Sequence, residues 1–99
     1  MKKRIILSEL SQRQLTEITI WYNSRRAGLG PVFLASLDRI MERISKFPAQ
    51  FPISYRDYRQ ALMDRFPYRI FYREEQQEIQ ILAVLHVSRD HDPFLKRIQ

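Results

Sequence analysis

The sequence predicts an α+β domain with an N-terminal strand, an α-helical hairpin and then a three-stranded antiparallel meander, which forms one sheet packed on the helices. Two patterns support this prediction. Apolar residues recur at helical spacing through residues 12–47, and the only glycine-containing segment, residues 28–31, divides them into two helices. From residue 58 onward the pattern changes to the alternation and the apolar runs that are typical of strands.

The first part of the chain is expected to form a short strand at residues 3–7 and a helix from Ser8 or Ser11 to about Arg26. Serine is a favoured N-cap because its hydroxyl accepts a hydrogen bond from the backbone of the first helical turn. One face of this helix is apolar. That face consists of Leu15, Ile18, Trp21 and Tyr22.

A second helix is expected after the turn that contains Gly28 and Gly30, with Pro31 in its first turn and Pro48 at its end. Its apolar positions recur at steps of three and four residues: Phe33, Leu34, Leu37, Ile40, Met41, Ile44 and Phe47. The aromatic residues of the two helices have aliphatic neighbours, which favours a place in the core. These aromatic residues are Trp21, Tyr22, Phe33 and Phe47.

Residues 48–57 contain Pro52 and indicate a loop. Three strands are expected to follow, at residues 58–63, 66–73 and 79–87, with a tight connection before the second of them and a hairpin loop before the third. The simplest arrangement is an antiparallel sheet that the helical hairpin covers on one face, while the other face stays partly open.

Alternation in the strand at residues 66–73 separates a core side from a basic side. Tyr68, Ile70 and Tyr72 are expected on one face, and Arg69, Phe71 and Arg73 on the other. The preceding strand could add Arg59 to the basic face. On such a face Phe71, between two arginines, is the candidate for stacking on a nucleobase.

Composition limits the classes of protein to be considered. A chain of 99 residues is expected to form a single domain, residues 1–99. With no cysteine it has neither a disulfide framework nor a thiolate metal site. The apolar run after the basic start is too short for an export signal, and no run is long enough to span a membrane, so we expect a cytoplasmic protein with no membrane partner.

Charge favours acidic partners. Seventeen Lys and Arg against eleven Asp and Glu give a formal net charge of +6, and most of the excess lies in the first sixty residues. Nucleic acid and an acidic protein segment would be attracted by the same field, so the charge does not choose between them. Arginine predominates over lysine, which favours specific contacts to carboxylate or phosphate.

The C-terminal third resembles the RelE/ParE superfamily of toxins from bacterial toxin–antitoxin pairs, and the ParE branch most. The resemblance rests on Phe66–Tyr72, on the long apolar strand Ile81–His86, and on Arg89, Asp90 and Pro93. The helical first half agrees with the family in length and order. The resemblance implies a RelE/ParE-like fold and a cognate acidic antitoxin whose segment, disordered when free, wraps around the toxin.

A ParE-like toxin is expected to inhibit DNA gyrase by protein contact without catalysing a reaction and without a cofactor. The residues expected to bind the target are Arg69, Arg73, His86, Arg89, Phe94, Lys96 and Arg97. Leu15, Trp21 and Leu37 on the helices are expected either in the core or in a groove for the antitoxin.

The alternative from the same superfamily is a RelE-like endoribonuclease that cleaves mRNA on the ribosome. Its catalytic residues would be Arg69 and Arg89, which would hold the phosphate, and His86 or His91, which would transfer a proton. A member that binds antitoxin but has lost toxicity is a third hypothesis. No metal site is expected, because His86, His91 and the neighbouring aspartates match no known ligand spacing.

Overall fold

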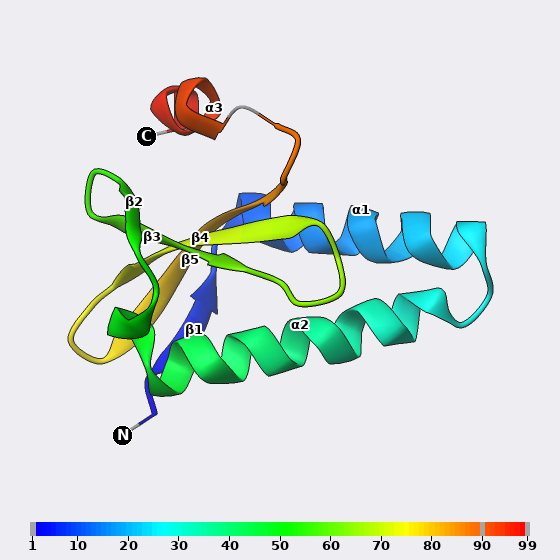
Figure 1. Ribbon diagram of the computed structural model, residues 1–99, viewed down its shortest axis with the longest axis horizontal. Helices are drawn as coiled ribbons and strands as arrows, with labels where there is room; N and C mark the ends of the chain where they lie inside the picture. Colours follow the sequence, from blue (N-terminus) through cyan, green and yellow to red (C-terminus); the bar gives the residue numbers. More distant parts are fainter. Residues whose placement is uncertain (1, 90, 99) are drawn as a thin grey trace.

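The computed structural model describes residues 2–89 and 91–98 and contains one mixed five-stranded sheet between two helical layers. The chain order is β1 (Arg4–Leu7), α1 (Glu9–Arg25), α2 (Leu29–Lys46), a 3-10 turn η1 (Pro48–Gln50), β2 (Ile53–Tyr55), β3 (Tyr58–Leu62), β4 (Tyr68–Glu74), β5 (Glu78–His86) and α3 (His91–Ile98). Helices α1 and α2 cover one face of the sheet and α3 lies on the other face (Figure 1). In the part of the chain that is described, no helix is both long and apolar enough to span a bilayer.

The α+β prediction is confirmed, with three additions. The strand order is β1-β5-β4-β3-β2, and β1 pairs with β5 in parallel, so the sheet is mixed and not wholly antiparallel. The predicted loop at residues 48–57 contains η1 and the edge strand β2, which is too short for alternation to reveal it. The C-terminal tail forms α3, with Pro93 in its first turn.

The start of α1 is attached to the sheet by its cap. Ser8 is the N-cap, and its Oγ accepts a hydrogen bond from the Ser11 backbone N–H at 3.0 Å. The same hydroxyl donates to the Leu82 carbonyl of β5 at 2.9 Å. The cap residue therefore sets the position of α1 relative to β5 as well as the start of the helix.

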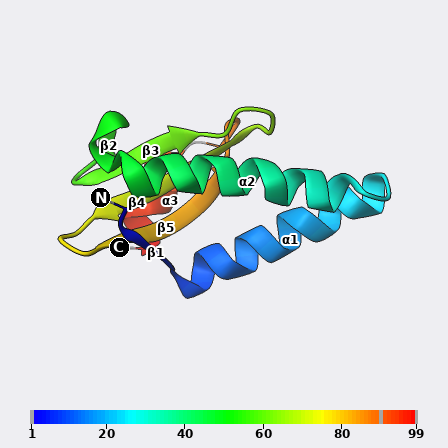
Figure 2. The same ribbon diagram turned by 90° about the horizontal axis from the view of Figure 1, so that it is seen from below.

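The hairpin turn depends on Gly28 and Asn23. Gly28 has a φ of +88° at the N-cap of α2, a backbone conformation that side chains other than glycine rarely adopt. The Asn23 Oδ1 accepts hydrogen bonds from the Gly28 and Gly30 N–H groups at 3.0 and 3.2 Å. The end of α1 and the start of α2 are thus held together. The two helices run antiparallel, side by side across one face of the sheet (Figure 2).

A β-bulge in β5 distributes the apolar residues of that strand between the two faces. Phe71 pairs with Ala83 but Tyr72 pairs with Ile81, so Leu82 is the extra residue. Ile79, Ile81 and Val84 consequently face the helical hairpin, whereas Ala83 and Leu85 face α3. Helices α1 and α2 cover the larger core. Helix α3 covers a small second core, to which it contributes the fully buried Leu95.

The core contains two of the four aromatic residues that were expected there. Phe33 is fully buried, and Tyr22 packs against the core. The expectation was wrong for Trp21 and Phe47, which are 49% and 60% exposed. Leu34 of α2 is also exposed. These side chains fall on the borders of the apolar stripes, where helical spacing does not decide between core and surface.

The packing of α3 leads to a stability prediction. Leu95→Ala should lower the free energy of unfolding by about 2–3 kcal/mol, because it empties the centre of the second core. The matched control is Leu62→Ala, since Leu62 is 54% exposed on β3 and should change the stability by less than about 0.5 kcal/mol. Urea unfolding of both variants measures the difference, and equal losses would contradict the proposed role of Leu95.

Candidate functional site

A cleft opens where β4 begins and β5 ends, between α1 and α3. Tyr68, at the start of β4, pairs with His86 at the end of β5, and both line the cleft. The complete lining is Leu10, Gln14, Glu17, Ile18, Tyr68, Val84, Leu85, His86, Arg89 and Phe94, around a volume of about 380 Å³. We refer to these residues as the β5–α3 cleft. Three of the residues predicted to bind the target meet here, namely His86, Arg89 and Phe94.

His86 is exposed at the end of β5, and its Nδ1 is engaged by Ser88. The Ser88 backbone N–H donates to Nδ1 at 3.1 Å, and the Ser88 Oγ lies 2.8 Å from the same nitrogen. With Nδ1 as the acceptor, the neutral ring carries its proton on Nε2. The ring also meets Tyr68 edge to face, with centroids 5.4 Å apart. His86 is therefore oriented by two neighbours.

Two guanidinium groups lie over the ring of Phe94 of α3. The Cζ of Arg89 is 4.4 Å from the centroid of the ring, and that of Arg97 is 5.9 Å away. Arg97 and the neighbouring Lys96 are exposed, whereas Phe94 is half-buried. We call Arg89, Phe94 and Arg97 the Arg89–Phe94–Arg97 unit. It places two positive charges against an apolar ring at the edge of the β5–α3 cleft.

Arg69 supports the chain that leads from β5 into α3. Its Nη1 donates to the Val87 carbonyl at 3.2 Å, and the side chain is half-buried. Its position brings it close to the turn that carries Arg89. The side chain of His91, the other candidate for proton transfer, lies outside the residues whose side chains the structure describes.

The β5–α3 cleft does not include Arg73, nor Arg59 and Phe71. Arg73 is at the opposite end of β4, paired with Glu75 at 3.1 Å, and its guanidinium lies over Tyr58, 5.6 Å from the ring centroid. The pKa of Arg73 is raised by Tyr58 and Glu75. Arg73 is thus a half-buried, paired residue at the end of β4 away from the β5–α3 cleft.

The expectation of a basic, open sheet face was wrong in two respects. Arg59 belongs to the helical face, because it pairs in register with Tyr72, and its Nη1 donates to the Phe51 carbonyl at 2.7 Å. Phe71 is fully buried beneath α3 in the second core, so its ring is covered and does not offer a stacking surface. Both errors arise because strand alternation does not predict where η1 and α3 pack against the sheet.

Sequence reasoning missed three residues that shape the β5–α3 cleft. Gln14 accepts a hydrogen bond from the Val84 N–H at 2.7 Å through its Oε1, which ties α1 to β5. Glu17 and Tyr68 line the same cleft. Tyr68 was assigned to the core by alternation, and nothing in the sequence distinguishes a core tyrosine from one at a cleft.

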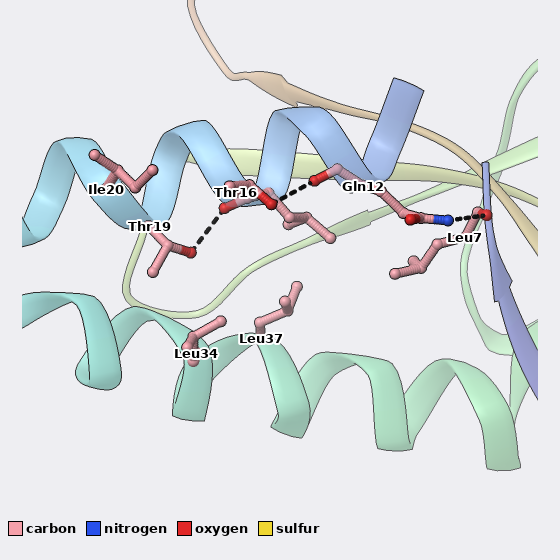
Figure 3. Close-up of a pocket in the computed structure, with 8 residues that line it drawn as sticks. Leu7, Gln12, Thr16, Thr19, Ile20, Leu34 and Leu37 are labelled. Carbon is pink, nitrogen blue, oxygen red and sulfur yellow. Dashed lines mark hydrogen bonds between the residues drawn. The ribbon is translucent and has the colours of Figure 1, made fainter. Parts of the chain in front are cut away.

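A second surface feature is an apolar groove between α1 and α2, with a volume of about 450 Å³ (Figure 3). It is lined by Leu7, Gln12, Leu15, Thr16, Thr19, Ile20, Leu34 and Leu37, and we call it the hairpin groove. Leu15 and Leu37 are almost fully buried, whereas Ile20 is 64% exposed. A neighbouring hollow shares Thr19, Ile20 and Leu34 and extends the groove to Pro31.

The polar side chains of the hairpin groove are occupied by local hydrogen bonds. Thr16 and Thr19 donate to the carbonyls four residues earlier, at 3.0 and 2.7 Å, and Gln12 Nε2 donates to the Leu7 carbonyl at 3.3 Å (Figure 3). The groove is therefore suited to aliphatic side chains. Elsewhere in the described part of the chain, no three His, Asp or Glu side chains gather in a way suited to a metal ion.

Burial and the neighbouring Tyr22 raise the pKa of Tyr68 to about 12, and burial also raises the pKa of Tyr72. A raised tyrosine pKa means that the folded state holds the proton more tightly than the unfolded state, whose tyrosine pKa is about 10. The resulting stability is present below pH 10 and is lost as the pH rises through 12.

We therefore predict that the free energy of unfolding falls between pH 10 and pH 12, and that Tyr68→Phe makes this fall shallower, because the variant has no phenol to ionise at that position. Urea unfolding at several pH values checks the slope. An unchanged slope in the variant would contradict the role given to Tyr68.

Comparison with known proteins identifies the family. No match is found among curated proteins. A solved structure described as "Chromosomal ParDE TA system from P. aeruginosa" is similar, with a TM-score of 0.76 and 17% sequence identity over 87% of this chain and 97% of that chain. At 17% identity, the similarity to this structure shows the fold alone. Residues 5–91 match the family model of the ParE toxin of the type II toxin–antitoxin system parDE, and the chain therefore belongs to the ParE toxin family.

Proposed function

We propose that this ParE-family toxin inhibits DNA gyrase by protein contact, without catalysing a reaction, and that a cognate acidic antitoxin neutralises it. The observation that carries the proposal is the Arg89–Phe94–Arg97 unit beside the β5–α3 cleft. Aromatic residues and arginine are enriched at the cores of protein interfaces, and arginine is among the residues that contribute most of the binding energy there. Gyrase as the target places the toxin in the cytoplasm.

The state of His86 supports a contact role. A general base needs a free lone pair within reach of the proton that it removes. In the neutral ring the lone pair of Nδ1 is directed to the Ser88 N–H, and Nε2 carries the proton. His86 is therefore better arranged to donate a hydrogen bond to a partner than to abstract a proton.

The hairpin groove is the proposed site for the antitoxin. Its exposed apolar side chains, Ile20 and Leu34, offer a surface to the hydrophobic side of an amphipathic segment. Strand β1 pairs with β5 and stands at the edge of the sheet that residues 2–89 form, so it leaves an edge beside Leu7 at the end of the groove. Exposed arginines on the helical hairpin would attract the carboxylates of such a segment: Arg13, Arg25, Arg26, Arg39 and Arg43.

The ribosome-dependent endoribonuclease is retained as the second candidate because His86 and Arg89 line one cleft, with Arg69 at the adjoining turn. The two functions are separated by adding purified toxin to a gyrase supercoiling assay and, in parallel, to ribosomes programmed with mRNA. Loss of supercoiling with accumulation of cleaved DNA supports the proposal. Codon-positioned mRNA cuts with unaffected gyrase overturn it, and His86→Ala should then abolish cleavage.

Phe94→Leu should weaken gyrase inhibition about tenfold, because it keeps an apolar side chain on α3 but removes the ring that two guanidinium groups contact. The measurement is the toxin concentration that halves supercoiling. Phe47→Leu is the control, since Phe47 is also exposed but lies at the end of α2. Equal potency of Phe94→Leu and the wild type would show that the unit does not contact the target.

Ile20→Glu should weaken binding of the antitoxin about 100-fold, because a carboxylate would be desolvated in an apolar interface and would repel an acidic partner. The partner to test is the product of the adjacent gene, measured by titration calorimetry. Leu62→Glu is the control on β3, away from the hairpin groove. The proposal also requires that Ile20→Glu still inhibits gyrase, and unchanged antitoxin affinity would exclude the groove.

A further inference from the structure

Four aromatic rings form the wall of a recess next to the β5–α3 cleft. The recess has a volume of about 400 Å³ and is lined by Glu17, Ile18, Trp21, Tyr22, Tyr68 and His86; we call it the aromatic recess. Its rings follow one another edge to face, with centroids 5.0 Å apart for Trp21 and Tyr22, 6.3 Å for Tyr22 and Tyr68, and 5.4 Å for Tyr68 and His86. Electron-rich ring faces of this kind attract cations.

Glu17 adds a negative charge to the aromatic recess. Its side chain is exposed on α1 and forms no ion pair or hydrogen bond with any residue that the structure describes. Arg13, one turn earlier, pairs with Glu9 instead, at 3.5 Å. A carboxylate without a partner is thus placed beside aromatic rings, in a chain whose net charge is +6. This charge complements a cation that comes from another molecule.

The cations of this chain that lie nearby are engaged elsewhere. Arg25 rests over the ring of Trp21, 4.7 Å from its centroid, but it is one turn beyond Trp21, on the side away from Glu17, and does not line the aromatic recess. Arg89 rests on Phe94 in the adjoining cleft. The contact of Arg25 shows that the indole ring accepts a guanidinium, while the recess between Trp21 and Glu17 remains open.

We propose that the aromatic recess receives an arginine side chain of the target protein, with the guanidinium against the Trp21 ring and its N–H groups donating to the Glu17 carboxylate. A planar guanidinium can stack on a ring and form a forked hydrogen bond to a carboxylate in the same pose. A nucleobase would stack as well, but it carries no positive charge to complement Glu17. The inference rests on the proposed function, because it states the chemistry that the target brings to that side of the toxin.

The test uses Trp21 as its own reporter, because it is the only tryptophan of the chain. Full-length toxin is titrated with N-acetylarginine amide and, separately, with N-acetylcitrulline amide, which has the same shape but no charge. We expect a saturable change in tryptophan emission with the arginine compound at millimolar concentration, and at least about fivefold weaker binding of the citrulline compound.

Glu17→Gln should weaken binding of the arginine compound about fivefold, since it keeps the size of the side chain and removes the charge. Glu9→Gln is the matched control on the same helix and should leave the binding unchanged, because Glu9 does not line the aromatic recess. Equal binding of the two amides, an unaffected Glu17→Gln variant, or stronger binding of adenosine monophosphate would each overturn the inference.

The supercoiling assay on the same preparations keeps the two proposals separate. If the toxin inhibits gyrase but shows no preference for the arginine compound, the inference about the aromatic recess fails and the proposed function stands. If both hold, Glu17→Arg should lose at least about tenfold in inhibition while it retains antitoxin binding, because the reversed charge repels the arginine of the target. Undiminished inhibition by Glu17→Arg would overturn the placement of a target cation at this site.

Discussion

The pairing of β4 with β5, interrupted by the bulge at Leu82, is the constraint on which the other features depend. The bulge changes which face the residues of β5 occupy, so that Val84 and His86 lie on the side of α1 while Ala83 and Leu85 lie on the side of α3. With a regular ladder, every residue beyond the bulge would point to the opposite face. His86 would then leave the β5–α3 cleft, and Leu85 would leave the second core.

Helix α1 takes part in both surfaces that we assign to partners. Its Ile20 faces the hairpin groove, and the adjacent Trp21 faces the aromatic recess. Consecutive helical residues point in directions about 100° apart, so one helix can supply neighbouring side chains to two interfaces. Under the proposed function, an antitoxin in the groove and a target in the cleft would contact two different sides of α1, and variants on one side should affect one partner.

Helix α3 carries Phe94, Lys96 and Arg97 of the proposed target surface with little packing of its own. One fully buried leucine, Leu95, anchors it on Phe71, Ala83 and Leu85. Arg69 of β4 donates a hydrogen bond to the Val87 carbonyl and so fixes the start of the segment that connects β5 to α3. The basic side chains of α3 are thus presented by a short helix whose orientation depends on the sheet beneath it, which links the second core to the display of Arg89, Phe94 and Arg97.

The sequence by itself determined the helical hairpin, the three-stranded meander and most of the residues that face the main core, because helical spacing, strand alternation and turn residues are local signals. It also indicated His86, Arg89 and Phe94, which the structure brings to one cleft. Only the tertiary structure decided that Phe71 is covered, that Arg59 and Arg73 lie elsewhere, and that Glu17 stands beside Trp21. These outcomes depend on α3, on the bulge in β5 and on contacts between residues far apart in the chain, for which local patterns carry no signal.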